Sequence, residues 1–224
     1  MRLFKEAEKL SPSGKISYVV ANAGMIKPDS VYNVSGDGEP QKPDLQILDV
    51  NITGSMYTIK LALHYFVKQN GTVESPDQED TCLVLIGSGA AFLDGPRAPQ
   101  YAASKWAMRG VLHSLRRTAF FHGSRVNMIT PWYIRTNILS EEAFNNVAKA
   151  GVEFAQLEDA QSCLLRVLGD TSINGRSLFI GARKWKSEGY WDLDIDDYHS
   201  NPIVEQIQQE QMWSDPVSKG LFPS

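Results

Sequence analysis

A strand, a turn and a helix within residues 82–121 constrain the fold of this chain more than any other feature. The apolar run 82–86 predicts a buried strand, which ends at Gly87 and Ser88. A loop rich in glycine and proline follows, and residues 101–121 then carry apolar side chains at helical spacing. A continuous apolar strand followed by such a helix is typical of a parallel sheet that helices cover on both faces. The chain is therefore predicted to be an α/β protein.

Tyr101 and Lys105 lie four residues apart on this predicted helix and therefore share one of its faces. An ammonium beside a phenol favours the phenolate, so Lys105 is expected to lower a tyrosine pKa that is about 10 when unperturbed. Such a phenol can donate a proton to a ketone or accept one from an alcohol near neutral pH. Ser88 ends its strand at the edge where parallel sheets bind ligands, and it can donate a hydrogen bond to the same oxygen.

A Tyr-x-x-x-Lys pair alone is weak evidence, because it more often marks a solvated helix face. Only one of the eight tyrosines has a lysine four residues on, and its helix follows a strand that ends in Gly-Ser. The pair is therefore interpreted as a candidate catalytic site.

The rest of the chain alternates short apolar strands with amphipathic helices. Asp44 is expected to cap a long helix, and Ser140 a shorter one that covers a substrate cleft together with the helix 157–168. Alternatively, the helix that begins at Ser140 and the helix 157–168 form only a surface layer that covers no cleft. The sequence predicts one domain over residues 1–181 and a C-terminal extension over 182–224. The remaining expected elements are helix 1–10, strand 16–21, loop 25–43, helix 44–69, strand 124–130, which Pro131 ends, and strand 177–180.

Composition excludes several classes of protein. A chain of 224 residues holds one well-buried domain, and a net charge of -4 without a basic cluster argues against binding of nucleic acid. The N-terminus does not resemble a signal peptide, and no apolar run reaches membrane-spanning length, so a cytoplasmic protein is expected. Cys82 and Cys163 lie in apolar runs, which indicates buried free thiols.

No metal site is predicted. No cluster of histidine and cysteine has the spacing of metal ligands. An aspartate-rich stretch in the extension is similar to a calcium-binding loop, but it lacks the required glycine and the distal glutamate. Its members are Asp192, Asp194, Asp196 and Asp197.

The candidate site resembles the catalytic centre of the short-chain dehydrogenases/reductases. Residues 21–24, Ala-Asn-Ala-Gly, are similar to the Asn-Asn-Ala-Gly signature after that family's fourth strand, and Asn51 matches the asparagine of its catalytic tetrad. The resemblance implies a Rossmann-like parallel sheet and an NAD or NADP cofactor. The catalytic residues that it implies are Asn51, Ser88, Tyr101 and Lys105. The cofactor-binding residues that it implies are Asn22, Ala23, Gly24, Tyr101, Lys105, Pro131 and Thr136.

The family also assigns a role to each catalytic position. Tyr101 is the expected acid/base, and Lys105 lowers its pKa and binds the nicotinamide ribose. Ser88 orients the carbonyl group of the substrate. Although an asparagine inside a helix usually points to solvent, the resemblance implies that the backbone carbonyl of Asn51 holds a water in a proton relay to Lys105.

Three further stretches resemble fungal secondary-metabolism members, of the 5′-hydroxyaverantin dehydrogenase type, and so imply a small, polyketide-like substrate. These stretches are 106–110, 131–136 and 174–179. Where the family commonly has Pro-Gly, this chain has Pro131-Trp132. Trp132 is therefore expected either to disturb the placement of the nicotinamide or to form a pocket wall for an aromatic substrate.

The glycine-rich turn that holds the pyrophosphate in this fold has no match in the sequence. The resemblance places Met1 in the helix before the family's fourth strand, so the first three strands are expected to be absent. The chain is then a fragment, a protein with a wrongly assigned start, or a naturally shortened protein. If nothing precedes Met1, the strand 16–21 is expected at the edge of the sheet, where unpaired backbone groups recruit another chain or cause aggregation.

Two other functions remain open at this point. A cofactor-independent isomerase or cyclase would use the same phenol for proton transfer, and a non-catalytic relative would keep only a pocket or an interface. The expected partner is a small molecule together with a second copy of the chain. The family commonly pairs the helices that correspond to 44–69 and 101–121 across a two-fold axis.

Overall fold

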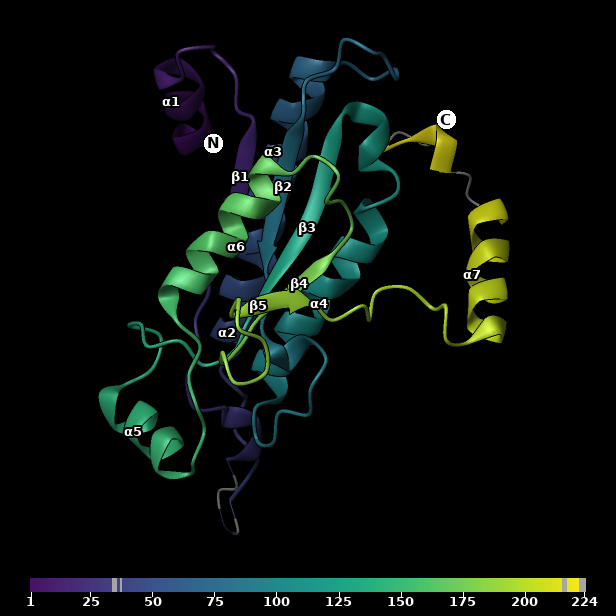
Figure 1. The fold of residues 1–224 in the computed structure, drawn as a ribbon. Helices are drawn as coiled ribbons and strands as arrows, with labels where there is room; N and C mark the ends of the chain where they lie inside the picture. Colours follow the sequence, from purple (N-terminus) through teal and green to yellow (C-terminus); the bar gives the residue numbers. More distant parts are fainter. Residues whose placement is uncertain (34–35, 37, 215–216, 222–224) are drawn as a thin grey trace.

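A computed structural model describes residues 1–33, 36, 38–214 and 217–221. Five strands form one sheet in the order β1-β2-β3-β4-β5 (Figure 1). Neighbouring strands are parallel from β1 to β4, whereas β5 pairs antiparallel with β4. The strands are β1 (Tyr18–Ala21), β2 (Thr81–Ile86), β3 (Ser124–Pro131), β4 (Ser177–Ile180) and β5 (Tyr190–Asp192). The prediction of a parallel α/β sheet with the first apolar strand at its edge is confirmed.

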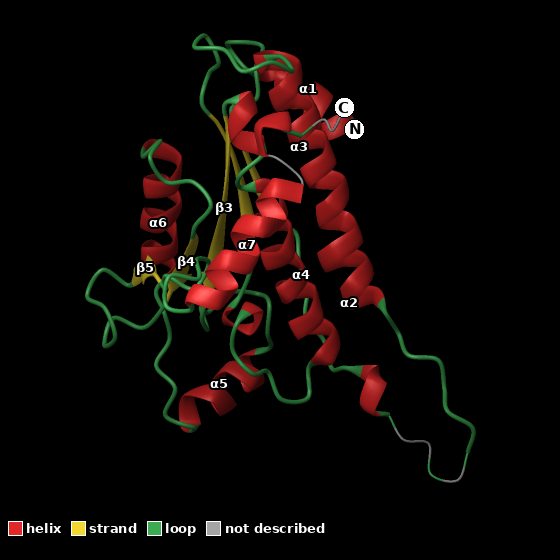
Figure 2. Ribbon diagram, turned by 90° about the vertical axis from the view of Figure 1, so that its right-hand side faces the viewer, coloured by secondary structure: helices red, strands yellow, loops and turns green. Residues whose placement is uncertain are grey.

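Helices cover the sheet on both faces, as Figure 2 shows in a view along the layers. Helices α3 and α4 lie on one face, and α6 lies on the other. The helices are α1 (Arg2–Leu10), α2 (Gln46–Leu48), α3 (Ser55–Asn70), α4 (Pro99–Leu115), α5 (Glu141–Lys149), α6 (Leu157–Gly169) and α7 (Pro202–Ser214). Among the described residues, no helix combines the length and the apolar character needed to cross a bilayer.

Strand β2 supplies both hydrophobic cores because its side chains alternate between the two faces. Leu83 and Leu85 are fully buried against α3 and α4, while Cys82 and Val84 are fully buried on the side of α6. Cys163 of α6 joins the second core, and both cysteines are free thiols, as predicted. Burial raises the pKa of Cys82 to about 11 and that of Cys163 to about 12, so neither is a reactive thiolate at neutral pH.

The predicted helix 44–69 has an interruption that the sequence pattern did not indicate. A π-helical turn, Asp49–Gly54, separates α2 from α3. Its one deeply buried residue is Asn51. The expected cap by Asp44 is displaced: the N-cap of α2 is Leu45, and Oδ1 of Asp44, one residue earlier, accepts a hydrogen bond of 2.9 Å from the backbone amide of Gln46.

Two predicted boundaries are wrong for reasons of tertiary structure. The strand expected from residue 16 begins at Tyr18, because the amide and carbonyl of Ile16 bond to the side chain of Gln69 instead of a neighbouring strand. The helix expected to reach residue 121 ends at Leu115, and a separate 3₁₀ turn, Ala119–His122, follows it. Strand β3 also extends one residue further than expected, to Pro131.

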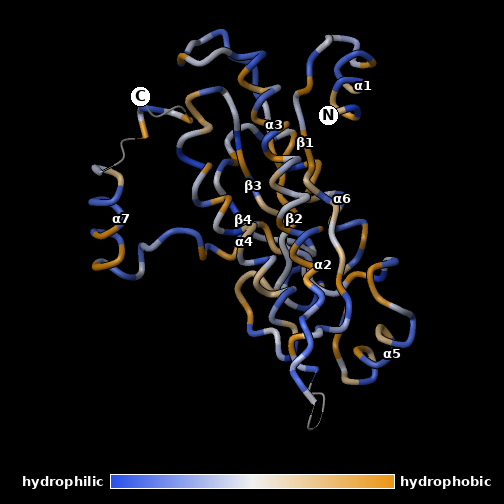
Figure 3. Tube along the Cα trace, turned by 180° about the vertical axis from the view of Figure 1, so that it is seen from behind, coloured by the Kyte–Doolittle hydropathy of each residue, from blue (hydrophilic) through white to orange (hydrophobic). Residues whose placement is uncertain are grey.

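The C-terminal extension contains two elements that were not predicted. Strand β5 adds to the sheet beside β4, so the extension begins as part of the same sheet. Helix α7 buries none of its side chains and lies away from the body of the molecule (Figure 1). The segment before α2 forms the expected polar loop, which Figure 3 shows as mainly hydrophilic. Parts of this expected loop (34–35, 37) and of the expected extension (215–216, 222–224) lie outside the described residues.

Candidate active site

A cavity of about 840 Å³ opens at the carboxyl ends of β1, β2 and β3. This is the edge of a parallel sheet at which ligands bind. Its lining includes seven of the residues predicted from the sequence, namely Asn22, Gly24, Ser88, Tyr101, Lys105, Pro131 and Thr136. Ala23 and Asn51 lie outside that lining. Three strands and the catalytic helix therefore bring most of the predicted site residues together.

Ser88 and Tyr101 meet across the turn between β2 and α4. Ser88 begins a 3₁₀ turn, and its Oγ accepts a hydrogen bond of 3.2 Å from the backbone amide of Ala90. Burial raises the pKa of the Tyr101 phenol, and the nearby Ser88 side chain opposes this rise. The phenol therefore stays protonated at neutral pH in this state of the protein, ready to donate a proton.

The expected influence of Lys105 on that phenol depends on where its ammonium lies. Lys105 is 7% exposed, and its Nζ donates a hydrogen bond of 3.0 Å to the carbonyl of Ile86. The same Nζ lies 5.6 Å from the centre of the Tyr101 ring. The pKa of Tyr101 is therefore raised in this structure, with burial as the largest cause, and a lowering by Lys105 stays a prediction. Burial also lowers the pKa of Lys105 itself, to about 8.

Asn51 is buried and holds the segment after β1 against the catalytic helix. Its Nδ2 donates to the carbonyl of Met25 at 2.9 Å and to Oγ of Ser104 at 3.0 Å, and its Oδ1 accepts from the amide of Met25 at 2.8 Å. A Cβ added to Gly24 would lie 3.5 Å from Oδ1 of Asn51 and 3.7 Å from Nζ of Lys105. The predicted neighbourhood of Asn51 and Lys105 is therefore present, while the relay water stays a prediction.

The start of α4 is fixed by a carboxylate that the sequence analysis did not single out. Asp29 accepts hydrogen bonds from the backbone amide of Gln100 at 2.8 Å and from its Nε2 at 2.9 Å. Pro99 occupies the first turn, where it lacks only an amide that a helix leaves unpaired. These contacts set the position of Tyr101, which directly follows Gln100. The distance of 71 residues between Asp29 and Gln100 explains why no local pattern indicated the pair.

Two adjacent aromatic residues, Trp132 and Tyr133, form another part of the lining where β3 ends. Their rings meet edge to face, with centroids 4.9 Å apart. A Cβ added to Gly89, next to Ser88, would lie 3.4 Å from the Trp132 indole, so this ring packs against the turn that carries the catalytic serine. The expected role of Trp132 as a pocket wall agrees with this position.

The cavity is closed on another side by the two helices that were expected to cover it. Phe144 of α5 and four residues of α6 contribute side chains to the lining. The serine expected to cap α5 does so, because Oγ of Ser140 accepts a hydrogen bond of 3.2 Å from the amide of Ala143. The α6 residues are Leu157, Ala160, Gln161 and Leu164.

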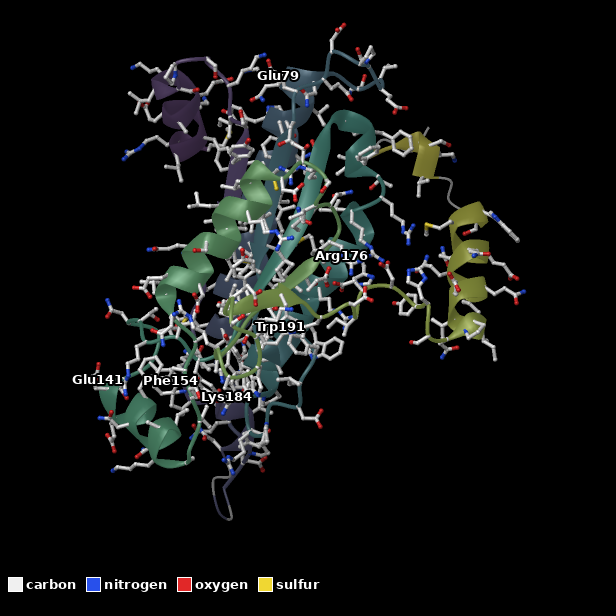
Figure 4. The ribbon with its side chains drawn as sticks, viewed as in Figure 1. Glu79, Glu141, Phe154, Arg176, Lys184 and Trp191 are labelled. Atoms are coloured by element: carbon white, nitrogen blue, oxygen red, sulfur yellow. The ribbon has the colours of Figure 1, made fainter. Side chains whose placement is uncertain are left out.

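The aspartates of the C-terminal extension bind Arg109 of α4 and Arg176, which is the residue just before β4. Asp196 is fully buried and accepts hydrogen bonds from Nε of Arg109 at 3.2 Å and from Nε2 of His113 at 3.0 Å. Arg176, labelled in Figure 4, bonds to Asp192, Asp194 and Asp197. The extension is therefore bound to the helix that carries Tyr101 and Lys105. The signal in the sequence for this contact was the run of aspartates within 192–197, together with Arg109 and Arg116, which are seven residues apart.

Comparisons with known proteins agree with this geometry. A sequence profile of the short chain dehydrogenase family matches residues 1–146. The 5′-hydroxyaverantin dehydrogenase of Dothistroma septosporum is 30% identical over 228 residues, which cover 94% of this chain and 72% of that protein. Its counterpart in Emericella nidulans is 28% identical and covers 93% of this chain and 72% of its own length.

Solved structures show the same fold at lower sequence identity. A 4-hydroxyisoleucine dehydrogenase complexed with NADH superposes with a TM-score of 0.63 and 24% identity, covering 83% of this chain and 74% of that one. A short-chain type dehydrogenase/reductase from Mycobacterium marinum has a TM-score of 0.65 with 19% identity and covers 81% of this chain and 69% of its own.

Proposed function

The chain belongs to the short-chain dehydrogenase family, and from this premise we propose that it interconverts an alcohol and a ketone on a small, polyketide-like metabolite with NAD or NADP. The observation that carries the proposal is the common cavity of Ser88, Tyr101 and Lys105 at the carboxyl end of the sheet. The relatives named for 5′-hydroxyaverantin support a substrate of the polyketide kind.

The residues at one side of the cavity fit the nicotinamide half of a dinucleotide. The Lys105 ammonium has three donors, and the carbonyl of Ile86 accepts from it at 3.0 Å, which leaves donors for ribose hydroxyls. Asn22, Pro131 and Thr136 line the same cavity and would contact the nicotinamide with Gly24. The sequence contains no glycine-rich turn for the pyrophosphate. We therefore assign contacts to the nicotinamide and its ribose alone.

The protein's own groups would manage the proton and the position of the carbonyl. When bound, the nicotinamide supplies the hydride to the carbonyl carbon during reduction or accepts it during oxidation. Ser88 donates a hydrogen bond to the carbonyl oxygen and orients it, and Tyr101 donates the proton that this oxygen gains on reduction. A phenol whose pKa is raised by burial is in the protonated form that reduction requires. Lys105 then stabilises the phenolate left behind.

We further propose a cytoplasmic homodimer. A groove of about 240 Å³ between α3 and α4 is lined by Met56, Leu63, Val111 and Leu115, among others, and supports pairing through these helices. Leu112 on the same helix is fully buried in the core and cannot take part. Two buried free thiols support a reducing compartment.

A single substitution tests the proposed acid/base. Tyr101→Phe removes only the hydroxyl and should reduce turnover of any ketone or alcohol substrate at least 100-fold, within the range of ~10²–10⁴ for general acid catalysis. Circular dichroism and the melting temperature should stay unchanged, as should the dissociation constant for NADH or NADPH measured by fluorescence. A variant that keeps more than a tenth of the activity would exclude Tyr101 as the proton donor.

A proton-exchange assay with the same variant distinguishes the dehydrogenase from the alternative, a cofactor-independent isomerase or cyclase. That alternative would use the Ser88, Tyr101 and Lys105 side chains of the cavity for proton transfer alone. It predicts that the protein exchanges α-protons of a ketone with deuterated solvent without any nucleotide, and that Tyr101→Phe abolishes the exchange. Nucleotide-dependent reduction without such exchange supports the dehydrogenase.

A further inference from the structure

The pair Trp132 and Tyr133 follows the last residue of β3 at the mouth of the cavity, and both side chains belong to its lining. The backbone on both sides of the pair is fixed. The amide of Trp132 donates to the carbonyl of Ile180 at 2.8 Å, and the carbonyl of Tyr133 accepts from the amide of Ala155 at 2.9 Å. The two rings are therefore held by β4 on one side and by the segment before α6 on the other.

The indole of Trp132 is held by an aromatic cluster behind it. Its ring centroid lies 5.7 Å from that of Trp185 and 6.3 Å from that of Phe179, in both cases edge to face. Gly89 packs against its other side, since an added Cβ would come within 3.4 Å of it. A ring fixed on these sides has little rotamer freedom left to lose when a ligand stacks on it.

The loop that carries Trp185 is itself anchored to α6. Arg183, two residues earlier, makes a two-pronged ion pair with the buried Asp159, with distances of 3.0 Å and 2.7 Å. Gly189, which ends the loop, crosses Asp159 so closely that an added Cβ would lie 1.9 Å from its Oδ2. These contacts keep Trp185 against Trp132 when the cavity is empty.

Tyr133 brings a second phenol to the neighbourhood of Tyr101. Its ring lies 6.4 Å from that of Phe154, which Figure 4 labels beside α5. Its hydroxyl is near enough that a negative charge there would raise the pKa of Tyr101. The lining is mainly apolar, with Leu93, Ile138, Leu139 and Phe144, and it also includes the polar residues Asp94, Asn137 and Gln161. A polar hydroxyl in such a wall fixes the orientation of a ligand that is mostly apolar.

We propose that Trp132 and Tyr133 determine the substrate class of this enzyme: a planar aromatic ketone or its alcohol that stacks on Trp132 and hydrogen-bonds to Tyr133 through a second oxygen on its ring. This inference rests on the proposed function and adds the substrate class to it. An aliphatic ketone of similar volume has no flat face for the indole and no second oxygen for the phenol.

The test compares three probes, 1-tetralone, 8-hydroxy-1-tetralone and 2-decalone, on the 224-residue chain and its variants. Trp132→Leu should lower kcat/KM for 1-tetralone about tenfold relative to 2-decalone, the loss expected for an aromatic contact of about 1.4 kcal/mol. Trp132→Phe keeps a ring and should keep the preference. Trp213→Leu, at a residue 74% exposed on α7, is the matched control. An unchanged ratio in Trp132→Leu overturns the role of the indole.

Tyr133→Phe tests the second contact. It should lower kcat/KM about fivefold for 8-hydroxy-1-tetralone, as expected for one hydrogen bond, and leave that for 1-tetralone within twofold. Because a negative charge on the phenol raises the pKa of Tyr101, the high-pH limb of the pH profile should also move to lower pH. Equal losses for both tetralones would show a merely structural role and overturn the assignment.

A binding measurement keeps this inference separate from the proposed function. Calorimetry with 1-naphthol, without nucleotide, should give a dissociation constant about tenfold weaker in Trp132→Leu than in the parent or in Trp213→Leu. If the parent reduces none of the ketones but shows this pattern, the dehydrogenase proposal fails while the aromatic site stands. If it reduces ketones but 1-naphthol binds all three proteins equally, the aromatic site is wrong.

Discussion

At the scale of single residues, the buried ammonium of Lys105 lowers the stability of the fold, although the proposed chemistry requires it. A buried ammonium with one backbone hydrogen bond has lost most of its hydration, and this is why the pKa of Lys105 falls from 10.5 to about 8. A folded-state pKa below the unfolded value means that the unfolded chain binds more protons between these two values. The charged lysine therefore destabilises the fold at neutral pH, and this cost disappears as the pH rises towards 10.5.

Replacement of this lysine should stabilise the protein while it inactivates the site. At about 1.4 kcal/mol per pKa unit the cost is about 3 kcal/mol at pH 7, and loss of the bond to Ile86 returns about 1 kcal/mol. Lys105→Met should thus raise the free energy of unfolding in urea by about 2 kcal/mol at pH 7. The gain should shrink at pH 9.5. A variant less stable than the parent at pH 7 would show that the ammonium is well compensated in the fold.

At the scale of elements, the catalytic helix α4 is held at both ends by partners far away in the sequence. Asp29 accepts from the amide of Gln100 at its start, and the extension binds Arg109 and Arg116 further along. Arg109 donates to the carbonyl of Ile195 at 2.6 Å, and Arg116 donates to the carbonyl of Asp196 at 2.7 Å. The position of the Tyr101 phenol therefore depends on the C-terminal extension as well as on the sheet.

The buried carboxylate of Asp196 should carry most of this attachment. Burial acts to raise its pKa, but hydrogen bonds from His113 and Arg109 and the charge of Arg109 outweigh it and hold the pKa well below its usual range. Asp196→Ala removes this fully buried carboxylate from Arg109 and His113 and should lower the free energy of unfolding by about 3 kcal/mol. Asp194→Ala, whose carboxylate is 74% exposed, should cost less than about 1 kcal/mol.

Stability measured at acid pH tests the sign of the contribution that the Asp196 carboxylate makes to folding. A depressed carboxyl pKa stabilises the fold above the unfolded value of 3.8, and this stabilisation is lost as the pH falls towards the folded pKa. The difference between parent and Asp196→Ala should therefore narrow below pH 4 in thermal melts. Equal losses in Asp196→Ala and Asp194→Ala at pH 7 would contradict the attachment.

At the scale of the whole molecule, two surfaces are available for a second chain. The groove between α3 and α4 is bordered by Met56, which is 47% exposed. The other surface is the outer edge of β1, which within the described part of the chain pairs with β2 alone. Unpaired strand edges invite association, so the predicted recruitment through β1 remains a second route.

A charge placed at the helical groove should separate the two routes. The parent chain should sediment as a dimer at micromolar concentration, and Met56→Glu should convert it into a monomer because a carboxylate would be buried at the interface. Leu165→Glu, at a residue 69% exposed on α6, is the matched control and should remain dimeric. Higher oligomers that persist in Met56→Glu would point to the β1 edge, and a strictly monomeric parent would exclude the dimer.

The sequence by itself predicted the parallel sheet, which the structure confirms, and the side chains of Ser88, Tyr101 and Lys105 that line one cavity. The apolar run 82–86 and the four-residue spacing of Tyr101 and Lys105 are local signals, because strand burial and helix periodicity act over a few residues. The cap of Ser140 on α5 was predictable for the same reason. Such features depend on neighbours in the chain, and the fold preserves them.

Only the tertiary structure decided how these side chains act. Asn51 sits in a π-helical turn and bonds to Met25 and Ser104, and burial rather than Lys105 sets the direction of the Tyr101 pKa. Strand β5 pairs with β4, although its 3 residues are too few to show a strand pattern in the sequence. Desolvation, edge pairing and hydrogen bonds between residues far apart in the chain depend on which groups the fold brings together, and no local pattern in the sequence contains that information.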